Sequence, residues 1–170
     1  MRLSIRNKFV GLGLLAALTL SGAASSQVGR AQDSARRDGS ESHAGKIEGT
    51  WRVQVTLRNC QTGDALKTFP AMLTFAQGGT LTGTTTAFSP ALRSPDHGVW
   101  EQTGRRTYSA VTDAFIFNPS GTWVMTQRIT QAIKFGGDPD EFNSDAKVEF
   151  FDTSGNLTST GCATAAANRF

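Results

Sequence analysis

Residues 49–58 have the sequence GTWRVQVTLR, in which apolar and polar side chains alternate from Trp51 onward. Trp51, Val53, Val55 and Leu57 share one face, and the polar residues between them share the other. A period of two indicates a β-strand with one face in a core and one face in water. The pattern recurs along the rest of the chain with short turns between the repeats. The stretch therefore predicts the first strand of an all-β domain.

Seven further strands are predicted, over residues 67–76, 80–88, 98–102, 105–118, 122–135, 142–152 and from 157 onward. Glycine and proline mark the turns between them, and glycine supplies the positive φ that tight hairpins need. A meander of this kind avoids exposed edges by pairing its last strand with its first. We therefore predict an all-β fold over residues 47–170, a closed or nearly closed eight-stranded antiparallel up-and-down barrel. A two-sheet sandwich is the alternative.

Residues 1–26 have the features of a secretory signal peptide. Basic side chains precede an apolar run over residues 9–20, and small residues follow it. The run is too short to span a bilayer, so we expect export to the periplasm or the exterior and no stable membrane insertion. Residues 27–46 are polar and have no apolar period, which predicts a flexible leader.

The charge balance argues against nucleic acid as a partner. The chain has 17 basic and 14 acidic side chains, but three of the basic ones and none of the acidic ones lie in residues 1–26. Without that segment the two signs balance. No surplus of positive charge then remains to bind a phosphate backbone.

The chain has two cysteines, Cys60 and Cys162, near opposite ends of the predicted domain. In an exported protein such a pair predicts a disulfide. Two free thiols are the less favoured alternative, and no second cysteine or histidine at ligand spacing supports a metal site. If the cysteines face each other on paired antiparallel strands, Arg169 lies beside Val53. A slip of one or two residues in this register stays open.

Gly49-Thr50-Trp51 at the start of the first strand resembles the glycine-x-tryptophan signature of lipocalins and their calycin relatives. The resemblance implies a calycin-like barrel over residues 47–170. In that family the tryptophan closes the base of the barrel, and a basic residue from the last strand packs over it. The resemblance therefore implies a structural plug made by Trp51 and Arg169. One difference is that Thr112-Asp113-Ala114 falls within a predicted strand, where the family has a threonine–aspartate–tyrosine turn.

In an up-and-down barrel the connections alternate between the two ends. The longest irregular segment, Ser89–His97, is therefore expected at the open end opposite Trp51, where it can act as a lid. It carries Arg93, Asp96 and His97. The histidine is a candidate ligand anchor, general acid or base, or haem ligand. The simpler interpretation is an ordinary loop histidine beside Trp100.

Gln127 and Gln131 interrupt the apolar face of the strand predicted over residues 122–135. If this face points inward, their amides lie in the barrel interior and need partners or a polar ligand. The alternatives are a β-bulge that turns the face outward, or hydrogen bonds to neighbouring strands. Several aromatic side chains either line the same interior or form plain core: Trp100, Phe115, Phe117 and Trp123.

The sequence contains no nucleophile elbow, zinc-protease helix or phosphate-binding glycine loop. We therefore expect a binding protein for a small hydrophobic or amphipathic molecule, without a cofactor or a metal. The candidate ligand contacts are Arg93, His97, Trp100, Gln127 and Gln131. The alternatives are an isomerase- or cyclase-type enzyme in a similar barrel and a packed barrel that acts as an interaction module. An apolar cavity favours binding, convergent ionisable groups favour catalysis, and a filled interior favours the interaction module.

Overall fold

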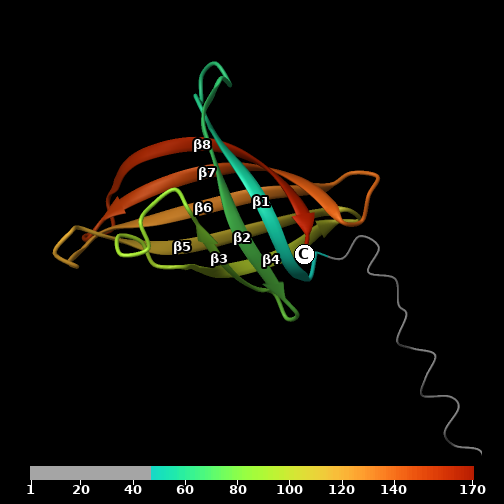
Figure 1. The fold of residues 1–170 in the computed structure, drawn as a ribbon, viewed down its shortest axis with the longest axis horizontal. Helices are drawn as coiled ribbons and strands as arrows, with labels where there is room; N and C mark the ends of the chain where they lie inside the picture. Colours follow the sequence, from blue (N-terminus) through green and yellow to red (C-terminus); the bar gives the residue numbers. More distant parts are fainter. Residues whose placement is uncertain (1–46) are drawn as a thin grey trace, which may run out of the picture. The chain divides into compact units, whose positions relative to one another are not determined.

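The computed structural model describes residues 47–170, which form a closed antiparallel barrel with its strands in sequence order (Figure 1). The strands are β1 (Gly49–Arg58), β2 (Ala65–Ala76), β3 (Thr80–Thr85), β4 (Asp96–Gly104), β5 (Thr107–Phe117), β6 (Trp123–Phe135), β7 (Glu141–Asp152) and β8 (Leu157–Arg169). The predicted eight-stranded up-and-down barrel is confirmed, and it is consistent with a lipocalin-like fold. The predicted signal peptide (residues 1–26) and leader (residues 27–46) lie outside the described residues.

The barrel closes where β8 pairs with β1, and the two strands run side by side in Figure 1. Trp51 pairs with Arg169 in this ladder, whereas the sequence places Val53 beside Arg169. The register therefore differs by two residues from the predicted one, within the slip left open. The reason is that Cys60 lies beyond the end of β1. It reaches Cys162 diagonally instead of facing it across the ladder.

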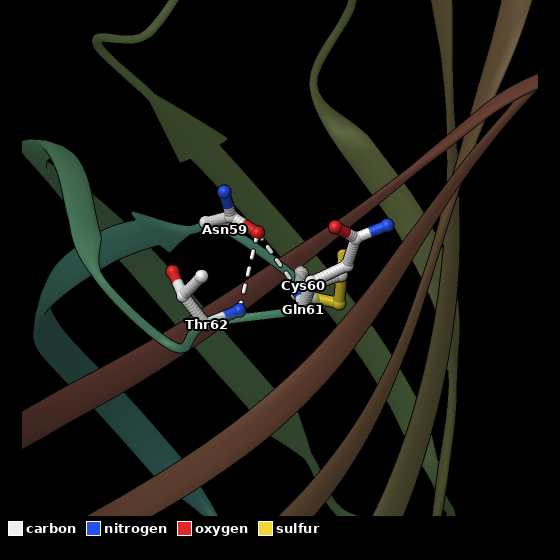
Figure 2. The surroundings of a disulfide bond; sticks show 5 residues. Asn59, Cys60, Gln61 and Thr62 are labelled. Atoms are coloured by element: carbon white, nitrogen blue, oxygen red, sulfur yellow. Dashed lines mark hydrogen bonds between the residues drawn. A yellow bond between two sulfur atoms is a disulfide. The ribbon is translucent and has the colours of Figure 1, made fainter.

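The predicted disulfide between Cys60 and Cys162 is present and spans 102 residues of sequence. It ties the turn between β1 and β2 to β8, as Figure 2 shows. Asn59 shapes this turn, because its side-chain oxygen accepts hydrogen bonds from the backbone N–H groups of Gln61 at 2.8 Å and Thr62 at 3.3 Å. A disulfide is compatible with an extracellular or periplasmic protein.

A ring of aromatic side chains fills the base of the barrel, where the chain enters β1. Neighbours in this aromatic ring lie 4.7 to 6.2 Å apart between centroids, in edge-on or tilted contacts that favour aromatic packing. Trp51 is fully buried, and its indole N–H donates to the Ile47 carbonyl at 2.8 Å. Burial also raises the pKa of the Tyr108 phenol. In order, the members are Trp51, Phe142, Phe75, Trp100, Tyr108 and Phe135, which contacts Trp51 again.

Arg169 lies over Trp51, with its guanidinium carbon 4.2 Å from the centre of the indole. Two further contacts hold the guanidinium there. Its Nε donates to the carboxylate of Asp140 at 2.7 Å, and its Nη1 donates to the carbonyl of Glu48 at 2.6 Å. The arginine therefore combines a cation–π contact with hydrogen bonds to the turn before β7 and to the start of β1.

We expect Gly49→Ala to lower the free energy of unfolding by about 1–3 kcal/mol, because Gly49 has a φ of +121°. A Cβ at this position also meets Arg169 Nη1 at 2.8 Å. Urea unfolding measures the loss. Gly155→Ala is the matched control, since Gly155 has a φ of +85° but an added Cβ there meets no atom within 4 Å. Equal losses in the two variants would show that contact with Arg169 adds nothing.

Candidate functional site

A cavity lies inside the barrel between the aromatic ring and the β3–β4 loop (residues 86–95). All eight strands contribute to its lining, and about 80 Å³ of it is open to the centre of a water molecule. On this measure a single water needs about 10–15 Å³. The cavity therefore has room for several waters or one small ligand, as an eight-stranded barrel allows.

One wall of the cavity is apolar and comes from β1, β2 and β8. The alternation in the sequence predicts the parts of this wall that come from β1 and β2. Nearer the base of the barrel, the same faces of these two strands carry Trp51 and Phe75, which belong to the aromatic ring. The apolar wall consists of Val53, Val55, Leu57, Phe69, Ala71, Leu73, Ala163 and Ala165. A ligand in the cavity therefore meets a broad hydrocarbon surface on this side.

The opposite wall carries a polar set contributed by the β3–β4 loop and strands β4 to β7. Its members are Arg93, Asp96, Thr112, Gln127, Gln131 and Ser144. These six are also the buried polar or charged residues of the part of the chain that the structure describes. Burying polar groups costs free energy unless they find partners. Polar burial in residues 47–170 is thus concentrated at this one wall, which is typical of a binding site rather than of plain core.

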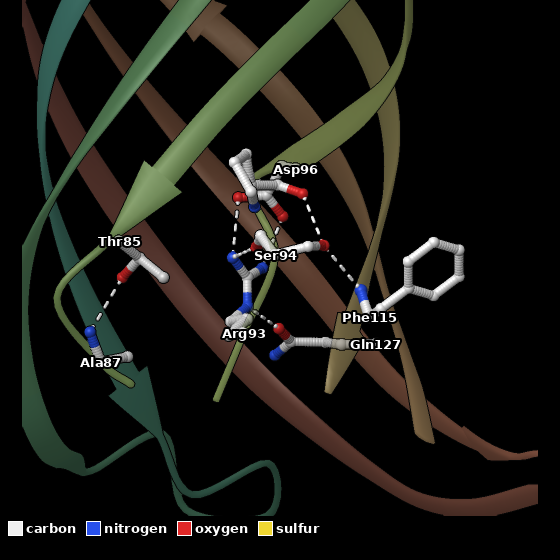
Figure 3. A network of polar contacts seen from close by, with 8 residues as sticks. Thr85, Ala87, Arg93, Ser94, Asp96, Phe115 and Gln127 are labelled. Carbon is white, nitrogen blue, oxygen red and sulfur yellow. Dashed lines mark hydrogen bonds and ion pairs between the residues drawn. The ribbon is translucent and has the colours of Figure 1, made fainter. Parts of the chain in front are cut away.

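Arg93 and Asp96 form a buried ion pair at the centre of the polar wall, shown in Figure 3. Arg93 Nη2 donates to one carboxylate oxygen at 2.5 Å, and Nη1 donates to the other at 3.1 Å. Arg93 Nε donates to Oε1 of Gln127 at 2.8 Å. Such two-pronged pairs hold both side chains in a fixed orientation. The guanidinium thus joins the β3–β4 loop to β4 and β6.

Backbone hydrogen bonds fix the β3–β4 loop against β5. Ser94 N donates to the Phe115 carbonyl at 2.9 Å, and Phe117 N donates to the Leu92 carbonyl at 2.9 Å. Arg93 lies between these two contacts and bridges to Ile116. The loop predicted over Ser89–His97 spans residues 86–95 in the structure, because β3 ends at residue 85 and β4 begins at residue 96. The segment expected to act as a lid is therefore bound to the barrel wall and directs Arg93 inward.

His97 and Trp100 do not line the cavity, although the sequence makes both candidate ligand contacts. Asp96 and His97 are the first residues of β4, not loop residues, and successive strand residues point to opposite faces. Since Asp96 is buried in the cavity wall, His97 is exposed on the outer face. Trp100 faces inward but lies in the aromatic ring, between Phe75 and Tyr108. Of the five candidate contacts, the structure brings Arg93, Gln127 and Gln131 together.

Trp123 lies on the outer face and is 40% exposed, whereas simple alternation places it on the inward face of β6. The pairing of β5 with β6 shifts here: Ile116 pairs with Met125 and Phe117 with Trp123, which leaves Val124 without a partner on β5. Such a β-bulge turns the residue before it to the other face. Trp123 instead packs against exposed Phe115, with ring centroids 5.9 Å apart.

Sequence reasoning missed Thr112 and Ser144 as cavity residues. Thr112 is 2% exposed and stands on the inward face of β5 between two buried alanines, Ala110 and Ala114. The signal was present, because a threonine between small apolar residues at a spacing of two shares their face. Ser144 follows Phe142 at the same spacing on β7.

A comparison with protein-family models found no match. The comparison with curated proteins found none either. Among residues 47–170, no group of three or more His, Cys, Asp or Glu side chains is placed to hold a metal ion. The same residues include no helix with the length and hydropathy needed to cross a bilayer. The geometry of the cavity is therefore the basis for assigning a function.

Proposed function

We propose that this protein is an exported binding protein that holds one small hydrophobic or amphipathic molecule in its barrel cavity. The observation that carries the proposal is the cavity itself, which is open between an apolar wall and a polar wall above a filled base. An apolar cavity with a few convergent polar groups is the usual form of a small-molecule site. The basic and apolar start of the chain and the disulfide support export.

We expect Ala165→Phe to abolish binding of toluene, a small apolar probe, because the phenyl ring fills the cavity. Ala165 lies on the cavity-facing side of β8, opposite Val55 in the β1–β8 ladder. Isothermal titration calorimetry of the purified protein measures the binding. Ala166→Phe is the matched control, since Ala166 is the next residue of the same strand and is exposed. We expect this control to bind toluene like the unmodified protein.

If the unmodified protein binds no toluene, or if Ala165→Phe binds it unchanged, the cavity is not a binding site. Native mass spectrometry of the protein purified from its own host gives a second readout. A small molecule that co-purifies with the unmodified protein should be missing from Ala165→Phe and present in Ala166→Phe.

An isomerase- or cyclase-type enzyme is a second candidate, favoured by one observation: two ionisable side chains, Arg93 and Asp96, line the cavity. Their geometry weighs against it. Both carboxylate oxygens of Asp96 already accept hydrogen bonds from Arg93, so the carboxylate is engaged in holding the loop. A general base needs a free oxygen within reach of the proton that it removes. Binding therefore accounts for the polar wall more simply than catalysis.

A further inference from the structure

The amide of Gln127 presents its N–H groups to the cavity. Its Oε1 accepts from Arg93 Nε at 2.8 Å, and because a guanidinium only donates, this contact fixes the orientation of the amide. In Figure 3 the oxygen faces Arg93 and the nitrogen turns away from it. No residue in the described part of the chain accepts a hydrogen bond from this nitrogen, although the residue is only 7% exposed. Among the described residues, Arg106 Nε is the one fully buried side-chain polar atom without a partner, so the Gln127 nitrogen is accessible and can donate to an acceptor inside the cavity.

Gln131 lies on the same face of β6 and lines the same cavity. Its Oε1 lies 3.5 Å from the hydroxyl of Ser144, at the outer limit for a hydrogen bond, and the residue is 9% exposed. Its amide nitrogen also has no acceptor among residues 47–170. Thr112 lies across from Ile129, between the two glutamines in the β5–β6 ladder, and adds a buried hydroxyl. The polar wall therefore offers the Gln127 amide donor, with the Gln131 amide and the Thr112 hydroxyl beside it.

The cavity carries no net charge. Its ionisable lining residues are Arg93 and Asp96, whose side chains are 3% and 7% exposed and neutralise each other. A carboxylate or ammonium ligand would leave its water shell and find no free counter-ion there. An uncharged oxygen that only accepts hydrogen bonds avoids this cost and satisfies the glutamine donors.

We propose that the cavity selects an uncharged molecule with an apolar body and a carbonyl-type oxygen, such as a ketone, ester or amide, which accepts hydrogen bonds from Gln127 and Gln131. The apolar body lies against the wall formed by β1, β2 and β8. This inference rests on the proposed function, because it names the chemical class of the ligand for the same cavity.

Calorimetry with four probes tests the selection at neutral pH: 2-octanone, octanoate, octylammonium and toluene. We expect 2-octanone to bind about tenfold or more tightly than octanoate or octylammonium, because both ions are bound without a free counter-charge. Octanoate binding as tightly as 2-octanone would overturn the inference and show that Arg93 exchanges Asp96 for a ligand carboxylate. Octylammonium binding as tightly as 2-octanone would also overturn the inference, and would show that Asp96 exchanges Arg93 for the ligand's ammonium group. If neither toluene nor 2-octanone binds, the proposed function fails as well.

Substitution of Gln131 tests the hydrogen bond itself. We expect Gln131→Leu to weaken 2-octanone binding about two- to tenfold relative to toluene binding, the effect of one neutral hydrogen bond. Gln54→Leu is the matched control, because Gln54 is exposed on the outer face of β1. It should leave both affinities unchanged. Gln131→Met, which keeps the side chain's length, replaces the leucine variant if that variant does not fold.

An unchanged affinity for 2-octanone in the Gln131 variant, with toluene still bound, would overturn the inference while leaving the proposed function intact. Equal weakening of toluene and 2-octanone would also overturn it. That result would mean that Gln131 shapes the cavity without donating to a carbonyl oxygen.

Discussion

Replacing Trp51 with alanine is expected to lower the free energy of unfolding by about 3–5 kcal/mol, as truncation of a large buried aromatic side chain does. The indole is fully buried and contacts Phe135 and Phe142 within the aromatic ring. Its loss also removes the surface under the Arg169 guanidinium and leaves the Ile47 carbonyl without its donor. Urea unfolding followed by circular dichroism measures the change.

Trp123→Ala is the matched control for this experiment, because it removes the same side chain from the outer face of the barrel. Trp123 is 40% exposed and packs mainly on Phe115, so its loss should cost at most about 1 kcal/mol. A loss for Trp51→Ala that is no larger than that for Trp123→Ala would show that the aromatic ring does not hold the base together.

Replacing both Cys60 and Cys162 with serine is expected to lower the free energy of unfolding by about 4–5 kcal/mol. The disulfide spans 102 residues, and in the chain-entropy model a cross-link over a loop of this length restricts the unfolded chain strongly. The bond joins the β1–β2 turn to β8, so its loss frees the hairpin from the strand that closes the barrel. Urea unfolding of the variant and the unmodified protein gives the difference.

A reducing agent provides the control for the disulfide experiment. Dithiothreitol should lower the stability of the unmodified protein to that of the double serine variant and should leave the variant itself unchanged. A stability that does not respond to reduction in the unmodified protein would mean that the cross-link contributes nothing to folding.

Period-two alternation was sufficient to predict the strands that face one another across the core. Every second residue from Trp51 to Leu57 and from Phe69 to Phe75 points inward as the alternation requires, and so do Gln127 and Gln131. These positions depend only on local pattern, since one face of each strand must leave water. The closure of β8 onto β1 also followed from sequence, because a meander without that pairing exposes two edges.

Features that depend on pairing between distant strands were not predictable in the same way. The bulge at Val124 follows from the register of β5 against β6, and nothing in the local sequence around Trp123 marks it. The start of β4 at Asp96 depends on pairing with β3 and β5, which moves His97 from a loop onto an outer strand face. The Arg93–Asp96 pair was missed for the same reason: its geometry arises where a loop meets a strand.

The filled base has a consequence for the proposed binding function. The aromatic ring fills one end of the barrel and the β3–β4 loop is fixed beside the other, so under the proposed function a ligand would enter and leave at the end beside the loop. A second molecule can therefore enter only after the first has gone. Under the proposed function, the protein would be a single-occupancy carrier that releases its ligand at the rim, and not a conduit from one side of the barrel to the other.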